Sequence, residues 1–320
     1  MCGIAGVFRP RGVIGDAERG ALARMLAAER HRGPDGQGVH EGEGVILGHL
    51  RLAVIDLSAS ARQPMANETE DVWLTFNGEI YNFAELRSEL RGLGHHFRSR
   101  TDAEVVLHGY EAWGMEKLLS RLRGMFAFAL WDEREGKLFL ARDRFGIKPL
   151  YFARGRDRFV FASEVLAIAA SGLVEVEPSE DSLAAFLALG SVPAPETALA
   201  GVFSIPAAHV VEISREGETT QRYWSFSPGE AREEAVPSLL HDAVRSHLVS
   251  DVPLGVFLSG GVDSASLVAI ASGFVEEPLK TLSIVLDDTA LDESAYARIV
   301  AEKYGTDHRE VEVRASDFLD

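Results

Sequence analysis

Short apolar runs separated by polar turns make up most of the first 195 residues. An apolar run of about four to eight residues that is bounded by turn residues is typical of a buried strand. Runs of this kind predict strands over residues 4–8, 72–76, 126–131, 138–141 and 159–162. Leu22, Met25 and Leu26 are spaced as on one face of a helix, which we expect to begin near Asp16. Several strands with a few helices indicate layered antiparallel sheets covered by helices.

The pattern changes after Pro237, where helices and strands alternate. Leu239, Ala243 and Val244 give the first helix an apolar face. Strands are predicted over 254–258, 281–286 and 311–313, with helices from 265 and over 293–304. This order predicts a doubly wound parallel sheet that binds ligands at the carboxyl ends of its strands. We therefore expect an α/β protein with a first domain over 2–195, a connector over 196–236 that contains a hairpin, and a second domain over 237–320.

Composition and charge narrow the class of protein. A chain of 320 residues suffices for two domains, and 46% hydrophobic with 25% charged residues is typical of a soluble globular protein. A formal net charge of −17 argues against a nucleic-acid partner. No apolar stretch approaches the roughly 20 residues that span a bilayer, so no membrane partner is expected. Cys2 is the only cysteine, which favours a reducing, cytoplasmic location.

Cys2 is also the first candidate for chemistry. If Met1 is removed, one residue carries both a thiol, with a pKa of about 8.5, and a free α-amine, with a pKa of about 8. Near neutral pH the amine can accept the proton of the thiol, which is how N-terminal-nucleophile hydrolases pair a nucleophile with its own base. A lone cysteine is more often a small buried apolar side chain, so this interpretation depends on a matching pocket.

Three further segments offer groups for such a pocket. Arg51 lies among apolar residues of a predicted strand, where it needs either an internal carboxylate or a substrate carboxylate. Asn77 and Gly78 follow an apolar run and are typical of a hairpin turn, but an amide side chain and a glycine N–H can also form an oxyanion hole. Asp102 fits a capping box at the start of a helix, or it could hold a substrate ammonium. The ten histidines show no spacing typical of a metal site, and His95-His96 is expected at the solvated surface.

A second candidate site is the segment Ser-Gly-Gly-Val-Asp-Ser over residues 259–264, between a predicted strand and a predicted helix. Its glycines allow backbone N–H groups to surround a phosphate, and the amino terminus of the helix adds positive potential. The segment lacks the lysine of a Walker A motif, which disfavours transfer of a γ-phosphate and favours release of pyrophosphate, as in adenylation. Asp263 is placed to bind the Mg²⁺ that such a leaving group needs.

Together these segments resemble the glutamine-hydrolysing asparagine synthetases, which are class II glutamine amidotransferases. The motifs that carry the resemblance are Met1-Cys2-Gly3-Ile4-Ala5-Gly6, Arg32-Gly33-Pro34-Asp35, His49-Leu50-Arg51-Leu52, Asn77-Gly78-Glu79-Ile80-Tyr81-Asn82, residues 142–151 and residues 259–264. The resemblance extends along the whole chain. It implies an amino-terminal four-layer α+β sandwich of the N-terminal-nucleophile hydrolase type, followed by an incomplete parallel α/β domain of the ATP-pyrophosphatase type.

The resemblance also implies roles for individual residues. In the glutamine site these are the nucleophile Cys2, the carboxylate-binding Arg51, the ammonium-binding Glu79 and Asp102, and the oxyanion-hole pair Asn77 and Gly78. In the ATP site they are Leu258 and Ile284 beside the adenosine, and Ser259, Gly260, Gly261, Asp263 and Ser264 beside the phosphates, with Asp263 on Mg²⁺. Glutamine hydrolysis would supply ammonia, which would attack an aspartate adenylated by ATP and give asparagine, AMP and pyrophosphate. The resemblance is compatible with a homodimer.

The chain departs from the family in length and at single positions. It stops at Asp320, short of the family's usual end, and a second glycine-rich segment with an Asp-Glu pair is not found. Family members usually carry a glycine near Ala208 and a lysine near Leu166. A glutamine-dependent asparagine synthetase is the leading interpretation, although we expect this chain to hydrolyse glutamine and to form little asparagine. The alternatives are a stand-alone glutaminase, an amidotransferase for another carboxylate acceptor, and a non-catalytic remnant that binds glutamine or a partner.

Overall fold

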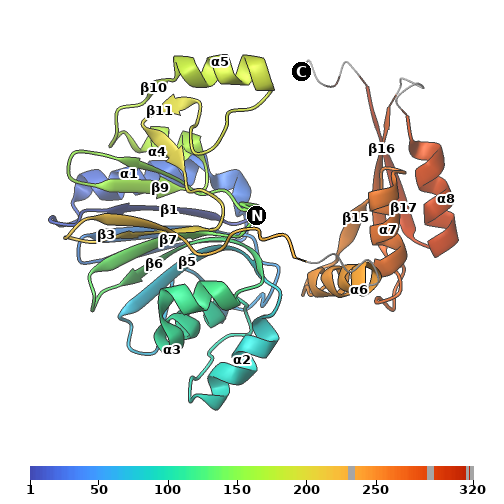
Figure 1. The fold of residues 1–320 in the computed structure, drawn as a ribbon, viewed down its shortest axis with the longest axis horizontal. Coiled ribbons are helices and arrows are strands. Elements are labelled where there is room, and N and C mark those ends of the chain that lie inside the picture. Colours follow the sequence, from blue (N-terminus) through green and yellow to red (C-terminus); the bar gives the residue numbers. More distant parts are fainter. Residues whose placement is uncertain (230–234, 287–291, 315–316, 318–320) are drawn as a thin grey trace. The chain divides into compact units, whose positions relative to one another are not determined.

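The computed structural model describes residues 1–229, 235–286, 292–314 and 317 (Figure 1). Two compact units are present, Met1–Ser227 and Pro228–Asp320. In the first unit two six-stranded antiparallel sheets pack face to face, and helices cover the outer face of each sheet (Figure 1). The predicted four-layer α+β sandwich is therefore confirmed.

The strands and helices of the first unit have the following bounds. The first sheet has the order β12 (Val202–Ser204), β8 (Tyr151–Arg154), β9 (Phe159–Ala162), β1 (Gly3–Phe8), β3 (Val45–Arg51) and β2 (Gly36–Gly42). The second sheet has the order β14 (Glu218–Arg222), β13 (His209–Ile213), β7 (Lys137–Arg142), β6 (Gly124–Asp132), β5 (Val72–Ile80) and β4 (Met65–Ala66). Helices α1 (Asp16–Ala28) and α4 (Val165–Ser171) cover the first sheet, and α2 (Phe83–Gly92) and α3 (Glu104–Arg121) cover the second. Shorter or peripheral elements are η1 (Arg30–Arg32), η2 (Ala59–Ala61), β10 (Glu177–Pro178), α5 (Glu180–Leu189) and β11 (Leu199–Ala200).

Alternation of side chains along the strands produces three apolar layers. In β1, Ile4 and Phe8 point between the two sheets, whereas Ala5 and Val7 point toward α1 and α4. β6 alternates in the same way between the first sheet and helices α2 and α3. Because both faces of these strands are buried, their sequences are nearly continuous apolar runs, which is why the pattern alone identifies them as strands.

The boundary of the first unit differs from the predicted one. The sequence predicts a connector over 196–236, but in the structure β12 pairs with β8, and the first strand of the β13–β14 hairpin pairs with β7. Val210, Val211 and Ile213 of β13 are buried in the two apolar layers beside the second sheet. These strands extend both sheets, so the division between the units falls after Ser227 and not near residue 195.

Ala208 stands immediately before β13 with a φ of 61°, in the left-handed region that favours glycine. Its N–H donates to the carbonyl of Asp143 at 2.8 Å, and its carbonyl accepts from the N–H of Tyr223 at 2.9 Å. These two hydrogen bonds fix the backbone conformation of Ala208. We expect Ala208→Gly to raise the free energy of unfolding by about 0.5–1 kcal/mol, because the strain removed exceeds the entropy that glycine adds to the unfolded chain. Urea denaturation measures this change. Ala207→Gly is the matched control and should lower stability; a loss of stability in both variants would contradict the expectation.

The second unit is a three-stranded parallel sheet with helices packed on it. Its strands have the order β15 (Gly255–Phe257), β16 (Lys280–Leu286) and β17 (Asp307–Val313), and its helices are α6 (Val236–His247), α7 (Val262–Ala271) and α8 (Ser294–Tyr304). The predicted strand–helix order and the parallel sheet are confirmed. Among the helices of the described residues, none combines the length and the apolar character that crossing a membrane requires.

The second unit buries much less of its sheet than the first unit does. Phe257 of β15 and Ile284 of β16 are 75% and 57% exposed, whereas Phe128 in β6 is fully buried. We expect the amide hydrogens of β15 and β17 to exchange at least about ten times faster than those of β1 and β6, since exchange follows local burial and edge strands open most easily. Hydrogen–deuterium exchange of the 320-residue chain measures this ratio. Equal protection of the two units would contradict it.

Candidate active site

Six residues that the sequence identifies as candidates line a single pocket in the first unit, here called the Cys2 pocket. These residues are Cys2, Arg51, Asn77, Gly78, Glu79 and Asp102. They come from the start of β1, the end of β3, the end of β5 and the loop before α3, so segments far apart in the sequence meet at one place. The cavity has a volume of about 110 Å³. At about 10–15 Å³ for each water-sized group, it can hold a molecule of the size of a free amino acid.

Cys2 is half-buried and lies immediately before β1. Its Sγ lies 3.6 Å from the carbonyl oxygen of Leu52 and 3.4 Å from the nitrogen of the same residue. Arg32 Nε donates to the Cys2 carbonyl at 3.0 Å and so fixes the backbone that carries the thiol. Burial raises the pKa of the Cys2 thiol, and burial lowers the pKa of the neighbouring α-amine, which Met1 carries here. Burial in the pocket therefore favours the uncharged forms of both the thiol and the amine.

Asn77 and Gly78 lie inside strand β5, where they pair with β6, and not in a hairpin turn. The side chain of Asn77 is 1% exposed, and its Nδ2 has no hydrogen-bond partner within the described part of the chain. An unpaired buried amide costs about 1–3 kcal/mol, so this donor is available to an oxygen atom that enters the pocket. A Cβ atom on Gly78 would lie 2.3 Å from the carbonyl oxygen of Met125, so only glycine fits beside β6 at this position.

Arg51 ends strand β3 and is held by backbone carbonyls. Its Nη1 donates to the carbonyl of Ser58 at 2.9 Å, and its Nη2 donates to the carbonyl of Asp56. Among the residues that the structure describes, its guanidinium forms no salt bridge, which argues against the internal ion pair considered from the sequence. Two neutral acceptors orient the guanidinium without neutralising it, so its positive charge is available to a carboxylate in the pocket.

Asp102 is buried at the base of the pocket and does not cap a helix. Helix α3 begins at Glu104 with no side-chain cap, whereas Asp102 Oδ2 accepts the N–H of Ile80 at 2.7 Å. Burial, together with the like charge of Glu79, raises the pKa of Asp102 to about 6. An ammonium group between Glu79 and Asp102 would stabilise both carboxylates, which fits the role that the resemblance implies.

Lys148 is a pocket residue to which the sequence analysis assigned no role. It lines the Cys2 pocket, is 7% exposed, and its pKa is lowered by burial. Two residues fix the loop that leads to Lys148. The carboxylate of Asp143 accepts hydrogen bonds from the N–H groups of four residues. The guanidinium of Arg142 donates hydrogen bonds to three backbone carbonyls. The sequence does contain a signal for Lys148, since it is a charged residue within the apolar segment 145–150. A charged side chain among apolar residues needs a counter-charge, as was argued for Arg51.

A buried carboxyl group lies behind the backbone of Cys2. Glu29 is fully buried, and its Oε1 accepts the N–H of Glu164 at 2.7 Å. Glu164 Oε1 accepts in turn from Arg32 Nη1 at 3.0 Å and contacts the ring of His31 at 2.8 Å. The motif that begins at Arg32 therefore connects the Cys2 carbonyl to this pair of glutamates.

Glu29 should make the stability of the protein depend on pH. Burial raises its pKa from 4.5 to about 8, so the folded state keeps a proton that the unfolded state has lost. Its contribution to stability is fully present below pH 4.5 and is lost as the pH rises toward about 8. We expect the wild-type chain to lose stability relative to Glu29→Gln across this window. Urea denaturation of both proteins at several pH values measures the difference, and a difference that stays constant with pH would contradict the assignment.

The second candidate site is formed by the turn between β15 and α7. Gly260 has a φ of 83°, and a Cβ atom there would lie 2.8 Å from the carbonyl oxygen of Glu293. The hydroxyl groups of Ser259 and Ser264 lie 3.1 Å apart and close the turn. Asp263 is exposed in the first turn of α7, where a cation can reach its carboxylate. The turn thus brings together the six predicted residues from 258 to 264, beside the amino terminus of α7.

Ile284 lies on β16, next to this turn. The N–H of Leu258 donates to the carbonyl of Leu282 at 2.9 Å, which places Ile284 just beyond the pairing of β15 with β16. Leu258 is 1% exposed and Ile284 is 57% exposed, so an apolar ligand group could contact Ile284 directly. The predicted site therefore lies at the carboxyl ends of two neighbouring parallel strands, where doubly wound sheets bind ligands.

Comparison with protein families gives two matches along the chain. Residues 1–224 match the glutamine amidotransferase domain, and residues 235–320 match asparagine synthase. Relatives include a glutamine-hydrolysing asparagine synthetase of Bacillus subtilis, 36% identical over all of this chain and 55% of that protein. A putative glutamine-hydrolysing asparagine synthetase of Mycobacterium bovis is 38% identical over all of this chain and 53% of that protein. The chain thus spans about half the length of these curated relatives.

Solved structures agree with the fold. The glutamine phosphoribosylpyrophosphate amidotransferase of Bacillus subtilis, in complex with ADP and GMP, matches 97% of this chain and 65% of that chain, with a TM-score of 0.53 and 19% identity. A second match, described as the allosteric regulatory enzyme of purine biosynthesis, has a TM-score of 0.54 and 16% identity over 97% of this chain and 80% of that chain. At this level of identity the likeness concerns the fold alone.

Proposed function

Because the chain belongs to the family of glutamine-hydrolysing asparagine synthetases, we propose that its first unit hydrolyses glutamine at Cys2. The observation that carries this proposal is the convergence of a thiol, an uncompensated arginine, two carboxylates and an unpaired amide donor in one pocket of amino-acid size. Each group matches one feature of glutamine: the side-chain carbonyl, the α-carboxylate and the α-ammonium. Removal of Met1 would place the α-amine on the residue that carries the thiol.

The reaction would proceed in two steps. The Cys2 sulfur attacks the side-chain carbonyl carbon of glutamine while the α-amine accepts the thiol proton. The negative charge on the carbonyl oxygen is stabilised by Asn77 Nδ2 and the N–H of Gly78. The α-ammonium returns the proton to the leaving nitrogen, the carbon–nitrogen bond breaks, and ammonia leaves a thioester on Cys2. Water then attacks the thioester with the amine again as base, which releases glutamate and restores the thiol.

Glutamine is selected by the groups at its other end. Arg51 would bind the α-carboxylate through its free positive charge, and Glu79 with Asp102 would bind the α-ammonium. The raised pKa of Asp102 supports this assignment, since a cation beside Glu79 and Asp102 would remove the repulsion between the two carboxylates. An amino acid with a shorter side chain, such as asparagine, would not bring its amide to Cys2 while both ends are bound.

In the second unit we propose an ATP site that adenylates aspartate, so that ammonia converts the activated carboxylate to asparagine. The backbone of the turn from Ser259 to Ser264 and the amino terminus of α7 would hold the phosphates. The exposed side chain of Ile284 would contact the adenosine, whereas Leu258, which is buried, could contact it only through its backbone. The exposed carboxylate of Asp263 fits a hard cation. Mg²⁺ held there would neutralise the charge of the pyrophosphate that leaves. A reducing, cytoplasmic location suits a protein whose nucleophile is a thiol.

The test separates the two halves of the proposal. The untagged chain is incubated with glutamine alone, and then with ATP, Mg²⁺ and aspartate, while glutamate, AMP and asparagine are measured. Glutamate formation without ATP, and none with asparagine as the amide donor, is expected from the first unit. Asp263→Asn should lower AMP formation and leave glutamate release unchanged. Absence of glutamate would reject the glutaminase activity. If AMP formed only when another carboxylic acid was added, that acid and not aspartate would be the acceptor.

A further inference from the structure

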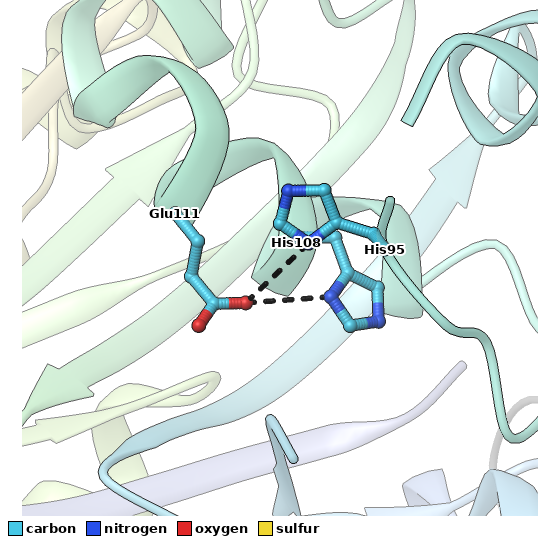
Figure 2. Close-up of side chains that lie close together, drawn as sticks. All are labelled: His95, His108 and Glu111. Carbon is cyan, nitrogen blue, oxygen red and sulfur yellow. Dashed lines mark hydrogen bonds and ion pairs between the residues drawn. The ribbon is translucent and has the colours of Figure 1, made fainter. Parts of the chain in front are cut away.

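Three polar side chains meet at the outer side of the second sheet, away from the Cys2 pocket. His95 lies in the loop after α2, and His108 and Glu111 lie one turn apart on α3. Figure 2 shows one carboxylate oxygen of Glu111 facing both imidazole rings. His108 Nδ1 lies 3.3 Å from Glu111 Oε2, and His95 Nδ1 lies 4.0 Å from the same oxygen. One nitrogen or oxygen atom from each residue lies within 4.8 Å of the other two.

The surroundings hold these side chains in place. Asn67 Nδ2 donates to Glu111 Oε1 at 2.7 Å, which fixes the carboxylate and leaves Oε2 toward the histidines. On the other side of the His108 ring, Nε2 lies 3.6 Å from the carboxylate of Glu104. Within the described residues this nitrogen has no hydrogen-bond partner. A carboxylate behind a histidine favours a proton on Nε2, so that Nδ1, which lies 3.3 Å from Glu111 Oε2, could give its lone pair to a metal ion held between them.

Accessibility also differs between the three ligands. The His108 side chain is 2% exposed, whereas those of His95 and Glu111 are 20% and 18% exposed. The site is therefore anchored in the protein on one side and reachable from solvent on the other. Glu68 Oε2 lies 3.7 Å from His108 Nδ1 and can supply a fourth oxygen. Such a half-open set of two imidazoles and carboxylates is suited to a borderline divalent cation rather than to Ca²⁺ or Mg²⁺.

We propose that His95, His108 and Glu111 form a binding site for a divalent transition-metal ion of the Zn²⁺ type. In a tetrahedral site with bonds of about 2.0–2.1 Å, ligand atoms lie about 3.3–3.5 Å apart. The pair on α3 already has this spacing, and the loop that carries His95 would move inward by less than about 1.5 Å to complete it. The sequence analysis expected both His95 and His96 at the solvated surface; the structure separates them, because His95 is half-buried in the cluster and His96 is exposed.

A bound ion would connect two elements that position the Cys2 pocket. The loop from His95 leads to Thr101 and Asp102, which line that pocket, and then enters α3. A metal bridge between the loop and α3 would therefore restrain the segment that carries Asp102. The metal proposal does not depend on the proposed glutaminase activity.

The alternative is that the cluster binds no metal ion and that His108 is protonated and paired with the neighbouring glutamates. Although burial disfavours a charged ring, the carboxylates of Glu104 and Glu111 raise the pKa of His108 to about 9. A network of a charged histidine and several glutamates needs no metal. Binding measurements decide between the proton network and the metal site, provided that the thiol and α-amine at the amino terminus cannot bind the ion instead.

The experiment uses the full chain without a histidine tag, with Cys2→Ala in every protein. Titration calorimetry with Zn²⁺ measures the affinity, and the visible absorption of bound Co²⁺ reports the coordination. We expect one Zn²⁺ per chain, a Co²⁺ spectrum typical of nitrogen and oxygen ligands, and a melting temperature that rises with Zn²⁺. His95→Ala should weaken Zn²⁺ binding at least about tenfold, and Glu104→Gln should weaken it by about 10–100-fold.

His96→Ala is the matched control, because His96 is adjacent in the sequence and lies outside the cluster. Its affinity for Zn²⁺ should equal that of the Cys2→Ala parent. The proposal is overturned if the parent binds no Zn²⁺ at about millimolar concentration, or if His95→Ala and His96→Ala bind equally well. The first outcome would assign the cluster to the proton network alone, and the second would place the ion elsewhere on the chain.

Discussion

Replacement of Cys2 by alanine should lower glutamate release by at least about 10⁴-fold while the first unit stays folded. Loss of a covalent nucleophile removes the reaction path itself, and losses of this order are typical of such residues. Little stability should be lost, since Cys2 is half-buried and the polar contacts of its sulfur within the described residues are long ones to the backbone of Leu52. Circular dichroism and the melting temperature, measured beside glutamate release, check both parts.

The base can be tested separately from the nucleophile. A thiol with an ordinary pKa of about 8.5 is only about 3% ionised at pH 7, and burial raises the pKa of Cys2 further, so the thiol needs a nearby base. A chain with a peptide extension before Met1 keeps Cys2 but has no free amine beside it. We expect this chain to lose glutaminase activity, and removal of the extension together with Met1 should restore it. Full activity of the extended chain would show that the α-amine is not the base.

Asn77→Ala is expected to lower kcat by about 10²–10³-fold, with a smaller change in the KM for glutamine. A donor that acts on the oxyanion stabilises the transition state more than the bound substrate. Its Nδ2 has no hydrogen bond within the described residues, so the substitution removes no internal bond of this group. The loss should therefore appear in kcat and hardly in the melting temperature.

Asn82→Ala provides the matched control for Asn77. The Asn82 side chain donates to the carbonyl of Arg121 and accepts from the N–H of Arg123, both at 3.0 Å, so it joins the start of α2 to the end of α3. We expect this variant to lose about 1–2 kcal/mol of stability and to keep a near-normal kcat. If the two variants showed the same pattern of losses, Asn77 would be a structural residue and the oxyanion hole would need another donor.

Burial and charge explain why the sequence alone predicts the layers of the first unit and suggests the residues of the Cys2 pocket. β1 and β6 are buried on both faces, so their apolar runs leave little doubt about strands. Arg51 among apolar neighbours required an anion, and the structure places it in the Cys2 pocket with its charge uncompensated. Arguments from burial and charge could single out Arg51 as a candidate because they do not depend on the distant segments that a residue meets; its role in binding a carboxylate stays a prediction.

Local motifs were less reliable where tertiary pairing overrides them. Asn77-Gly78 is typical of a turn, but pairing with β6 keeps it in a strand. Asp102 stands where a capping residue would stand, yet its carboxylate binds the N–H of Ile80, a partner 22 positions away. The strands of residues 202–222 were assigned to a connector for the same reason, because their partners β8 and β7 lie far back in the chain. His95 and His108 are separated by a loop and a helical turn, and no spacing rule connects them.

The close approach of β6 to Gly78 also limits how this protein can change. A Cβ atom at position 78 would lie 2.3 Å from the carbonyl oxygen of Met125 and 2.7 Å from the Cα of Phe126, and neither backbone atom can move without disturbing a central strand. A library with all amino acids at position 78 should therefore return glycine alone, even under selection for folding without activity. Activity toward a new amide substrate must then evolve through changes around the α-carboxylate and α-ammonium of the substrate. The backbone that faces the reacting carbonyl stays invariant.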